Sequence, residues 1–143
     1  MYVLDTNILV AALWSRNGAS FEILRRVLSG KLAIAVSVAL VLEYEDVLKR
    51  AAIAEASWAD EGQLDIILDA VLFQALRIMP IRTRLRPALR DPADEMVLEC
   101  AVQAGAKAMV TMNDRDFRKA CKTYRLELLR PGALLRRLEG EDE

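Results

Sequence analysis

Histidine is absent from the 143 residues of the chain. This absence excludes a histidine general base, a Ser-His-Asp triad and a zinc site with histidine ligands. Acid–base or metal chemistry must therefore come from carboxylates, lysine or tyrosine. Cysteine is scarce as well: Cys100 and Cys121 are too few for a disulfide framework, and we expect both to be buried free thiols.

Long apolar runs and a targeting segment are also missing. The longest apolar run, residues 32–42, contains Ser37 and stops at Glu43, so it is too short to cross a bilayer. No basic segment precedes an apolar one at the N-terminus. We therefore expect a soluble, cytoplasmic protein with no membrane partner. The length and the 54% hydrophobic content predict a single domain over residues 1–143.

The net charge of −1 hides an uneven distribution of charge. Five arginines follow one another with no acid among them: Arg77, Arg82, Arg84, Arg86 and Arg90. A second basic segment spans residues 115–125. Two basic segments on a balanced chain indicate a local anionic partner, and ordinary solvated arginines are the alternative.

Short apolar segments alternate with helical patterns along the chain. Buried strands are predicted at residues 2–4, 32–36, 76–80, 108–111 and 126–129. Helices are predicted at about residues 21–28 with Ser20 as cap, 38–48 with Ser37 as cap, 57–75, 92–104, 114–123 and 134–138. Residues 5–7 are expected to form a capped turn. Alternating helices and apolar strands indicate an α/β fold with a parallel sheet covered on both faces.

Aspartates gather where the predicted strands end. Asp5 ends the first strand, Asp91 and Asp94 open a helix, and Asp114 and Asp116 follow the fourth strand. Ligands of a parallel sheet bind beyond the carboxyl ends of its strands, so these side chains are expected to converge. For any one aspartate taken alone, helix capping is the alternative.

Helical phase singles out one acid in each of two helices. Asp94 falls on the apolar face of its helix, and Glu43 lies at the border of the apolar face of another. A carboxylate on a buried face is costly unless it is paired or binds a cation. A capping box is the alternative for Asp94, whereas Glu43 has no capping alternative. The other acids of the two helices are predicted to point away from the apolar faces: Glu45, Asp46, Glu95 and Glu99.

Several carboxylates in one pocket cannot all stay ionised without a counter-charge. Mg²⁺ or Mn²⁺, which prefer oxygen ligands, are the simplest counter-charge in a chain without histidine. Two such ions would serve to activate a water and stabilise the leaving oxygen in phosphodiester cleavage. Hydrogen bonds that orient the ligands and the water are expected from Thr6, Asn7, Thr111 and Asn113.

These motifs resemble those of PIN domains, the nucleases named after the PilT N-terminus. The likeness spans essentially the whole chain, in the family's order. The motifs are Tyr-Val-Leu-Asp5-Thr6-Asn7, Glu43 in Ser-Val-x-Leu-Val-Leu-Glu-Tyr, Asp91-Pro92-Ala93-Asp94-Glu95, and Val110-Thr111-Met112-Asn113-Asp114-Arg115-Asp116-Phe117. The third motif is similar to that of the VapC toxins of toxin–antitoxin pairs.

The resemblance implies a three-layer α/β/α fold with a central five-stranded parallel sheet of order 3-2-1-4-5. It also implies Mg²⁺- or Mn²⁺-dependent cleavage of RNA, a homodimer, and inhibition by a small antitoxin protein. The catalytic acids and metal ligands that it implies are Asp5, Glu43 and Asp94, with Asp91 beside them. Asn113 stands where the family often has an aspartate, so Asp116 and Asp114 are both candidates for the fourth acid.

The arginine-rich loop before Asp91 is expected to lie beside this site. Candidate contacts to RNA phosphates are Arg82, Arg84, Arg86, Arg90 and Arg115. Solvation of the loop is an equal alternative.

Two other functions stay open. Asp5 is a conceivable nucleophile of an aspartyl-phosphate phosphatase, but such a site wants a second aspartate where this chain has Asn7, and no glycine-rich phosphate loop is present. The other possibility is a PIN fold that has lost catalysis and serves as a binding module. Asn113 is its best support, and the retained acids count against it.

Overall fold

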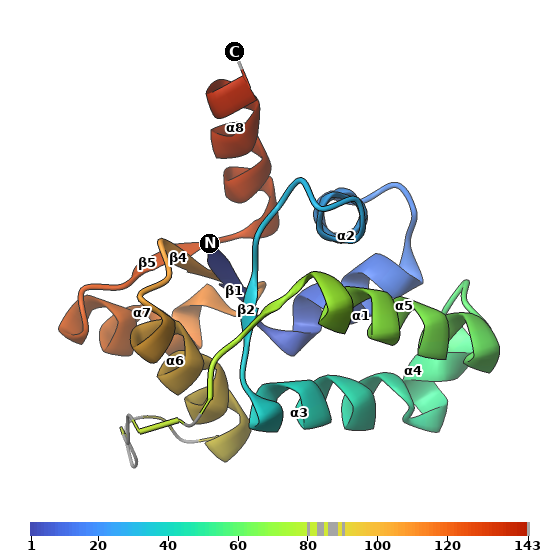
Figure 1. Ribbon diagram of the computed structural model, residues 1–143, viewed down its shortest axis with the longest axis horizontal. Helices are drawn as coiled ribbons and strands as arrows, with labels where there is room; N and C mark the ends of the chain where they lie inside the picture. Colours follow the sequence, from blue (N-terminus) through green and yellow to red (C-terminus); the bar gives the residue numbers. More distant parts are fainter. Residues whose placement is uncertain (80, 83–84, 86–88, 90, 143) are drawn as a thin grey trace.

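Short parallel strands lie at the centre of the computed structural model, with helices around them (Figure 1). The structure describes residues 1–79, 81, 82, 85, 89 and 91–142. The strands in this part of the chain are β1 (Tyr2–Leu4), β2 (Ala35–Val36), β3 (Leu76–Arg77), β4 (Ala108–Val110) and β5 (Glu127–Leu129). The helices are α1 (Thr6–Trp14), α2 (Ala19–Leu28), α3 (Val38–Leu48), α4 (Ala51–Ala56), α5 (Glu61–Gln74), α6 (Pro92–Ala104), α7 (Asp114–Thr123) and α8 (Pro131–Asp142).

The described strands form two parallel sheets instead of the predicted single five-stranded sheet. One sheet has the order β1-β4-β5, and the other pairs β2 with β3. A single parallel bridge between Tyr2 and Ile34 links them, with the Tyr2 N–H donating to the Ala33 carbonyl at 3.0 Å. The predicted α/β class with parallel strands flanked by helices is confirmed.

Capping contacts confirm two of the predicted helix starts. The Ser37 hydroxyl accepts a hydrogen bond from the Leu40 N–H at 3.1 Å at the start of α3. The Asp91 carboxylate accepts one from the Ala93 N–H at 2.9 Å at the start of α6. Helix α6 ends at Gly105, whose φ of +63° is a left-handed conformation that glycine adopts without strain. Local sequence is sufficient for these boundaries because each depends on residues within three positions.

Helices α1 and α4 were not predicted from the sequence. The segment after Asp5 continues into α1 where a capped turn was expected. Its side chains are apolar around most of the helix, so the sequence carries no one-sided stripe. Helix α1 packs against α2, α3 and α4, so it is covered on several sides, as suits such a helix.

Two helix starts differ from the prediction. Helix α2 begins at Ala19 with Gly18 at the cap position, so the expected Ser20 cap is wrong, and Ser20 is buried inside the helix. Helix α5 begins at Glu61, later than expected, because Asp60 caps it. The last helix, α8, is longer than predicted and extends away from the rest of the molecule (Figure 1).

The core lies between the strands and the surrounding helices. Its largest fully buried side chains include Tyr44, Phe117, Leu4, Ile8 and Met109. Both cysteines are free and buried, as predicted, and burial raises the pKa of each thiol to about 11. Over the described ranges, none of the helices has both the length and the apolar character that crossing a bilayer requires.

The Tyr44 hydroxyl connects α3 to the end of β1. Tyr44 is 1% exposed, and its hydroxyl donates a hydrogen bond to the Leu4 carbonyl. We expect Tyr44→Phe to lower the free energy of unfolding by about 1–2 kcal/mol, because a buried hydrogen bond is lost without a change in packing. Urea denaturation measures this loss. Tyr124→Phe is the matched control on an exposed tyrosine, and an equal loss in both variants would contradict the prediction.

Candidate carboxylate site

Asp5 lies directly after β1 and is held in place from several directions. It is 7% exposed, and its backbone N–H donates to the Val110 carbonyl of β4 at 2.8 Å. One carboxylate oxygen accepts from the Thr6 N–H at 2.8 Å, and the other accepts from the Thr111 hydroxyl at 2.7 Å. Burial raises the pKa of Asp5, and these two hydrogen bonds partly offset the rise. Asp5 therefore presents a fixed, partly desolvated carboxylate at the end of the strand.

Thr111 is the centre of a hydrogen-bond network that joins the ends of β1 and β4. Its fully buried hydroxyl oxygen, which donates to Asp5, also accepts from the Asn113 N–H at 2.9 Å and from Asn7 Nδ2 at 3.3 Å. The Asn7 side-chain oxygen in turn accepts from the Met112 N–H at 3.2 Å. The polar residues predicted to orient the acids thus lie together around Asp5.

Thr6 carries an unused hydrogen-bonding group next to Asp5. The side chain is 7% exposed, and its hydroxyl oxygen has no hydrogen-bond partner among the described residues. Buried hydroxyl groups normally have a partner, so an unpartnered one marks a place for a ligand or a water.

Glu43 of α3 and the two aspartates at the start of α6 face the same hollow as Asp5. This hollow has a volume of about 430 Å³. Its lining consists of Asp5, Thr6, Asn7, Val10, Ala11, Trp14, Glu43, Val47, Asp91, Ala93, Asp94, Met112 and Asn113. The structure therefore brings together acids that are separated by up to 89 positions in the chain.

The charges of these acids act on one another. The pKa of Asp94 is raised from 3.8 to about 6, first by burial and then by the negative charges of the other acids. Those acids are Asp5, Asp91, Asp116 and Glu43. Burial also raises the pKa of Glu43, with Asp46, Asp91 and Asp5 adding to the rise and Arg50 opposing it. The five acids thus form one electrostatically coupled cluster, which we call the acid cluster: Asp5, Glu43, Asp91, Asp94 and Asp116.

Asp116 joins the cluster from a second hollow of about 640 Å³. The amide nitrogen of Asn113 donates to the Asp116 carboxylate at 2.6 Å and so orients it. The lining of this hollow consists of Leu89, Asp91, Asp94, Asn113, Asp116, Lys119, Ala120, Thr123 and Tyr124. Three of these residues also line the first hollow, so the two hollows meet at the acid cluster.

Asp114 is held apart from the cluster by two arginines. Its carboxylate pairs with Arg130 at 2.8 Å and with Arg118 at 3.1 Å, and the hydrogen bond from Arg130 lowers its pKa. Asp114 lines neither of the two hollows. Of the two candidates for the fourth acid, the structure therefore brings Asp116 to the other acids.

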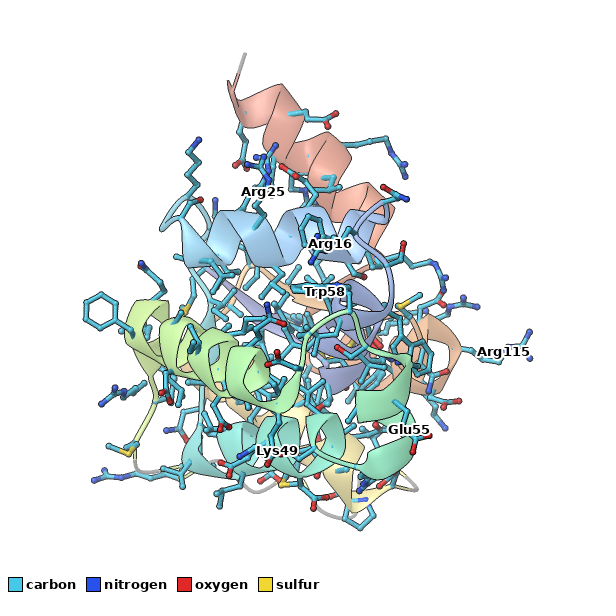
Figure 2. The ribbon with its side chains drawn as sticks, turned by 90° about the vertical axis from the view of Figure 1, so that its right-hand side faces the viewer. Arg16, Arg25, Lys49, Glu55, Trp58 and Arg115 are labelled. Atoms are coloured by element: carbon cyan, nitrogen blue, oxygen red, sulfur yellow. The ribbon has the colours of Figure 1, made fainter. Side chains whose placement is uncertain are left out.

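The predicted phosphate-binding arginines that the structure describes lie away from the hollows. The Arg82 backbone N–H donates to the side chain of Gln103. Gln103 follows Asp94 by nine residues in α6, which corresponds to about 13 Å along the helix at about 1.5 Å per residue. The Arg115 side chain points away from the molecule (Figure 2). The remaining three candidates, Arg84, Arg86 and Arg90, lie outside the described residues.

The acids predicted to point away from the apolar faces are exposed in α3 but buried in α6. Glu45 and Asp46 are exposed, as predicted. Glu95 and Glu99 are only 4% and 2% exposed, although they were predicted to point away from the apolar face. Helix α6 packs against α3, β1, β2 and β4, so much more of its circumference is covered than one apolar stripe indicates. Asp91, not Asp94, provides the side-chain cap of this helix.

Several residues that line the two hollows were not predicted from the sequence. Trp14 and Val10 belong to α1, which carries no one-sided stripe, and the spacing of Val47 indicates only a core position. Lys119 had a detectable signal, because it follows Asp116 by three positions on a helix and must share its face.

The side chains of the acid cluster are chemically suited to bind a divalent cation. Among the described residues, no group of three or more acids or cysteines stands close enough together to hold a metal ion as the side chains lie. The donor set nonetheless consists of carboxylates with the unpartnered Thr6 hydroxyl beside them, which are the oxygen ligands that Mg²⁺ and Mn²⁺ prefer.

These features define an α/β protein with parallel strands and a carboxylate site beyond the strand ends. Residues 1–115 match the family model of the PIN domain, and the chain belongs to the PIN domain family. PIN domains are typically nucleases and generally use divalent metals. The matched segment includes every acid of the cluster except Asp116, which follows it directly. Comparisons with curated proteins and with solved structures give no match.

Proposed function

We propose that this PIN domain is an Mg²⁺- or Mn²⁺-dependent endoribonuclease. The observation that carries the proposal is the acid cluster, whose mutual repulsion and burial raise the pKa of Asp94 to about 6. Such a cluster is unfavourable at neutral pH without a positive charge among its members. A divalent cation supplies that charge.

The residues that would hold the metal are Asp5, Glu43, Asp94 and Asp116. A bound ion would supply activation of a water and stabilisation of the charge on the leaving oxygen. Asp5 is prepared for this role because the Thr6 N–H and the Thr111 hydroxyl hold both of its oxygens. Preset ligand geometry lowers the cost of ordering the site when the ion binds.

Other groups of the chain are suited to the RNA itself. A rotation of the Thr6 side chain would bring its unpartnered, buried hydroxyl to a phosphate oxygen in the first hollow. Lys119 places a positive charge on the wall of the second hollow, where a neighbouring phosphate would pass. Contacts of this kind position the strand without reading its sequence.

Incubation with single-stranded RNA tests the proposal. We expect the purified chain to cut end-labelled RNA internally in Mn²⁺ or Mg²⁺, and to leave it intact when EDTA removes the ion. Gel analysis of the products measures cleavage. Intact RNA in the presence of Mn²⁺, from protein with a native circular dichroism spectrum, would rule out the proposal.

A binding module without catalysis is the second candidate. Two observations favour it: no group of described acids stands at metal-binding distance, and Asn113 occupies the position of a family aspartate. Calorimetric titration with Mn²⁺ distinguishes the two. The nuclease requires binding that Asp5→Asn weakens, whereas the binding module predicts no heat from either protein. An aspartyl-phosphate phosphatase is not favoured, because Asn7 stands where such a site wants a second aspartate. The Asn7 side chain is instead hydrogen-bonded to Thr111 and Met112.

We further propose that the chain is the toxin of a toxin–antitoxin pair, forms a homodimer, and is inhibited by a small antitoxin protein. Exposed apolar side chains around a hollow of about 250 Å³ support a protein partner. They are Val38, Leu42 and Met79, each more than half exposed. Light scattering of the purified chain tests the dimer, and the mass of a single chain would exclude it.

A further inference from the structure

The hollow that holds Asp5 and Glu43 also has an aromatic wall. Trp14, the last residue of α1, lines it and is 51% exposed. The adjacent lining is apolar and comes from Val10 and Val47. This exposed indole shares one hollow with the acids, so an aromatic face and the carboxylates line the same concave surface.

The end of α1 that carries Trp14 is firmly anchored. The Trp14 indole N–H donates to the Ile53 carbonyl of α4 at 3.3 Å. Trp58 holds the last turn of α1 through two hydrogen bonds, from its indole N–H to the Ala12 carbonyl at 2.8 Å and from its backbone N–H to the Leu13 carbonyl at 2.9 Å. The Trp14 ring is thus exposed, yet its position is set before any ligand arrives.

Trp58 is partly buried and packs against other side chains. The Arg16 guanidinium lies over the Trp58 ring at 4.5 Å, as Figure 2 shows, and Phe21 meets its edge with ring centroids 5.9 Å apart. Trp58 therefore has a packing role, which leaves Trp14 as the tryptophan with a free face. Both tryptophans of the chain are accounted for in this way.

Building on the proposed nuclease function, we infer that Trp14 is the surface on which an unpaired nucleobase stacks next to the cleaved phosphodiester. A flat, pre-positioned aromatic ring beside a phosphate-cleaving site matches the face of a base, and stacking of this kind tolerates any base. A base inside a duplex is stacked on both sides and cannot offer its face to Trp14. The RNA that stacks on Trp14 must therefore be single-stranded at that nucleotide.

The second hollow offers a path along which the RNA strand can continue. It meets the first hollow at Asp91, Asp94 and Asn113. A strand whose base rests on Trp14 can cross the acid cluster and leave past Lys119 and Tyr124. The stacked base is then on one defined side of the cleaved bond.

Fluorescence in a cleavage-deficient background tests the contact directly. In Asp5→Asn protein with Mn²⁺, we expect single-stranded RNA to quench tryptophan emission and the matching duplex to leave it unchanged. Adding Trp14→Phe should remove the quenching, since Trp58 lines neither of the two hollows. Quenching that persists after Trp14→Phe, or equal quenching by the duplex, overturns the inference.

Kinetics with modified RNA provide the second test. Trp14→Ala is expected to raise KM about tenfold, with a smaller change in kcat, and Trp14→Phe to recover most of the loss. An abasic nucleotide on one side of the cleaved bond should raise the KM of the wild type about tenfold, and one on the other side should leave it unchanged. Neither should raise the KM of Trp14→Ala further. Phe73→Ala, which removes an aromatic ring that is 83% exposed on α5, is the matched control without effect.

The outcomes separate this inference from the proposed function. Cleavage by the wild type with an unchanged KM for Trp14→Ala overturns the stacking role and leaves the nuclease standing. Absence of cleavage by the wild type overturns the nuclease. The fluorescence titration then still decides the stacking role, which quenching at Trp14 supports and its absence rejects.

Discussion

Asp5→Asn is expected to slow RNA cleavage by about 100- to 1000-fold, because it removes a charge at the centre of the acid cluster. An asparagine oxygen can still accept the hydrogen bond from the Thr6 N–H, but its NH₂ group cannot ligate a cation. Facing Thr111, that NH₂ group meets a hydroxyl that already accepts two hydrogen bonds. The substitution therefore removes a ligand while it perturbs the fold only locally.

Initial rates of cleavage in Mn²⁺ measure this effect, with circular dichroism and the melting temperature in EDTA as tests of folding. Asp114→Asn is the matched control, since it makes the same change in an acid that two arginines hold outside the hollows. Its rate should stay within about threefold of the wild type, as expected for an exposed ion pair. Asp116→Asn should instead resemble Asp5→Asn. A loss for Asp114→Asn as large as that for Asp5→Asn would show that Asp114 belongs to the site.

Mn²⁺ is expected to stabilise the wild-type protein strongly near pH 7.5 and hardly at all near pH 5. Metal binding requires ionised carboxylates, and the pKa of Asp94 is about 6. An ion concentration of about 100 times Kd adds about 2.7 kcal/mol to the free energy of unfolding. The melting temperature should then rise by roughly 5–10 °C. Differential scanning calorimetry with and without Mn²⁺ at the two pH values measures the change.

Without metal, the pH dependence has the opposite direction. The pKa of Asp94 is about 6 in the folded protein against an ordinary value of 3.8, so the folded state binds the proton more tightly. The resulting stabilisation is complete below about pH 4 and is lost as the pH rises through about 6. Asp94→Asn in EDTA near pH 7 should therefore raise the free energy of unfolding by on the order of 1 kcal/mol, a value reduced for partial exposure.

Asp94→Asn tests both the stability without metal and the response to Mn²⁺. Asp94→Asn should gain stability in EDTA and lose most of the response to Mn²⁺. Asp69→Asn, at an exposed acid of α5, should change neither property. If Asp94→Asn responds to Mn²⁺ as strongly as the wild type, Asp94 is not a metal ligand.

Some features of the fold were predictable because they depend on neighbouring residues. The cap contacts of Ser37 and Asp91 span two or three positions, and the sequence alone predicted both. Helix α7 has its predicted bounds, and each predicted strand segment contains a strand, although β2 and β3 have only two residues each and β3 is exposed. The absence of histidine also restricted the candidate metal ligands largely to oxygen donors.

The acids of the site were predictable in part. Asp5, Asp94 and Glu43 followed from strand ends and helical phase, and the structure places them around one hollow. The choice between Asp114 and Asp116 was not predictable, because Arg130, sixteen positions beyond Asp114, pairs with that acid. Such a pair depends on how β5 and its neighbours pack, which local sequence does not determine.

The sequence by itself determined the type of fold, the positions of most helices and strands, and the oxygen-rich character of the site. The tertiary structure alone decided that the strands divide into two sheets, that Glu95 and Glu99 are buried, and that Trp14 lines the hollow of the acids. The physical reason is the range of the interactions. Capping and periodicity act over a few residues, whereas burial and charge coupling depend on elements that are distant in the chain and meet only in the folded protein.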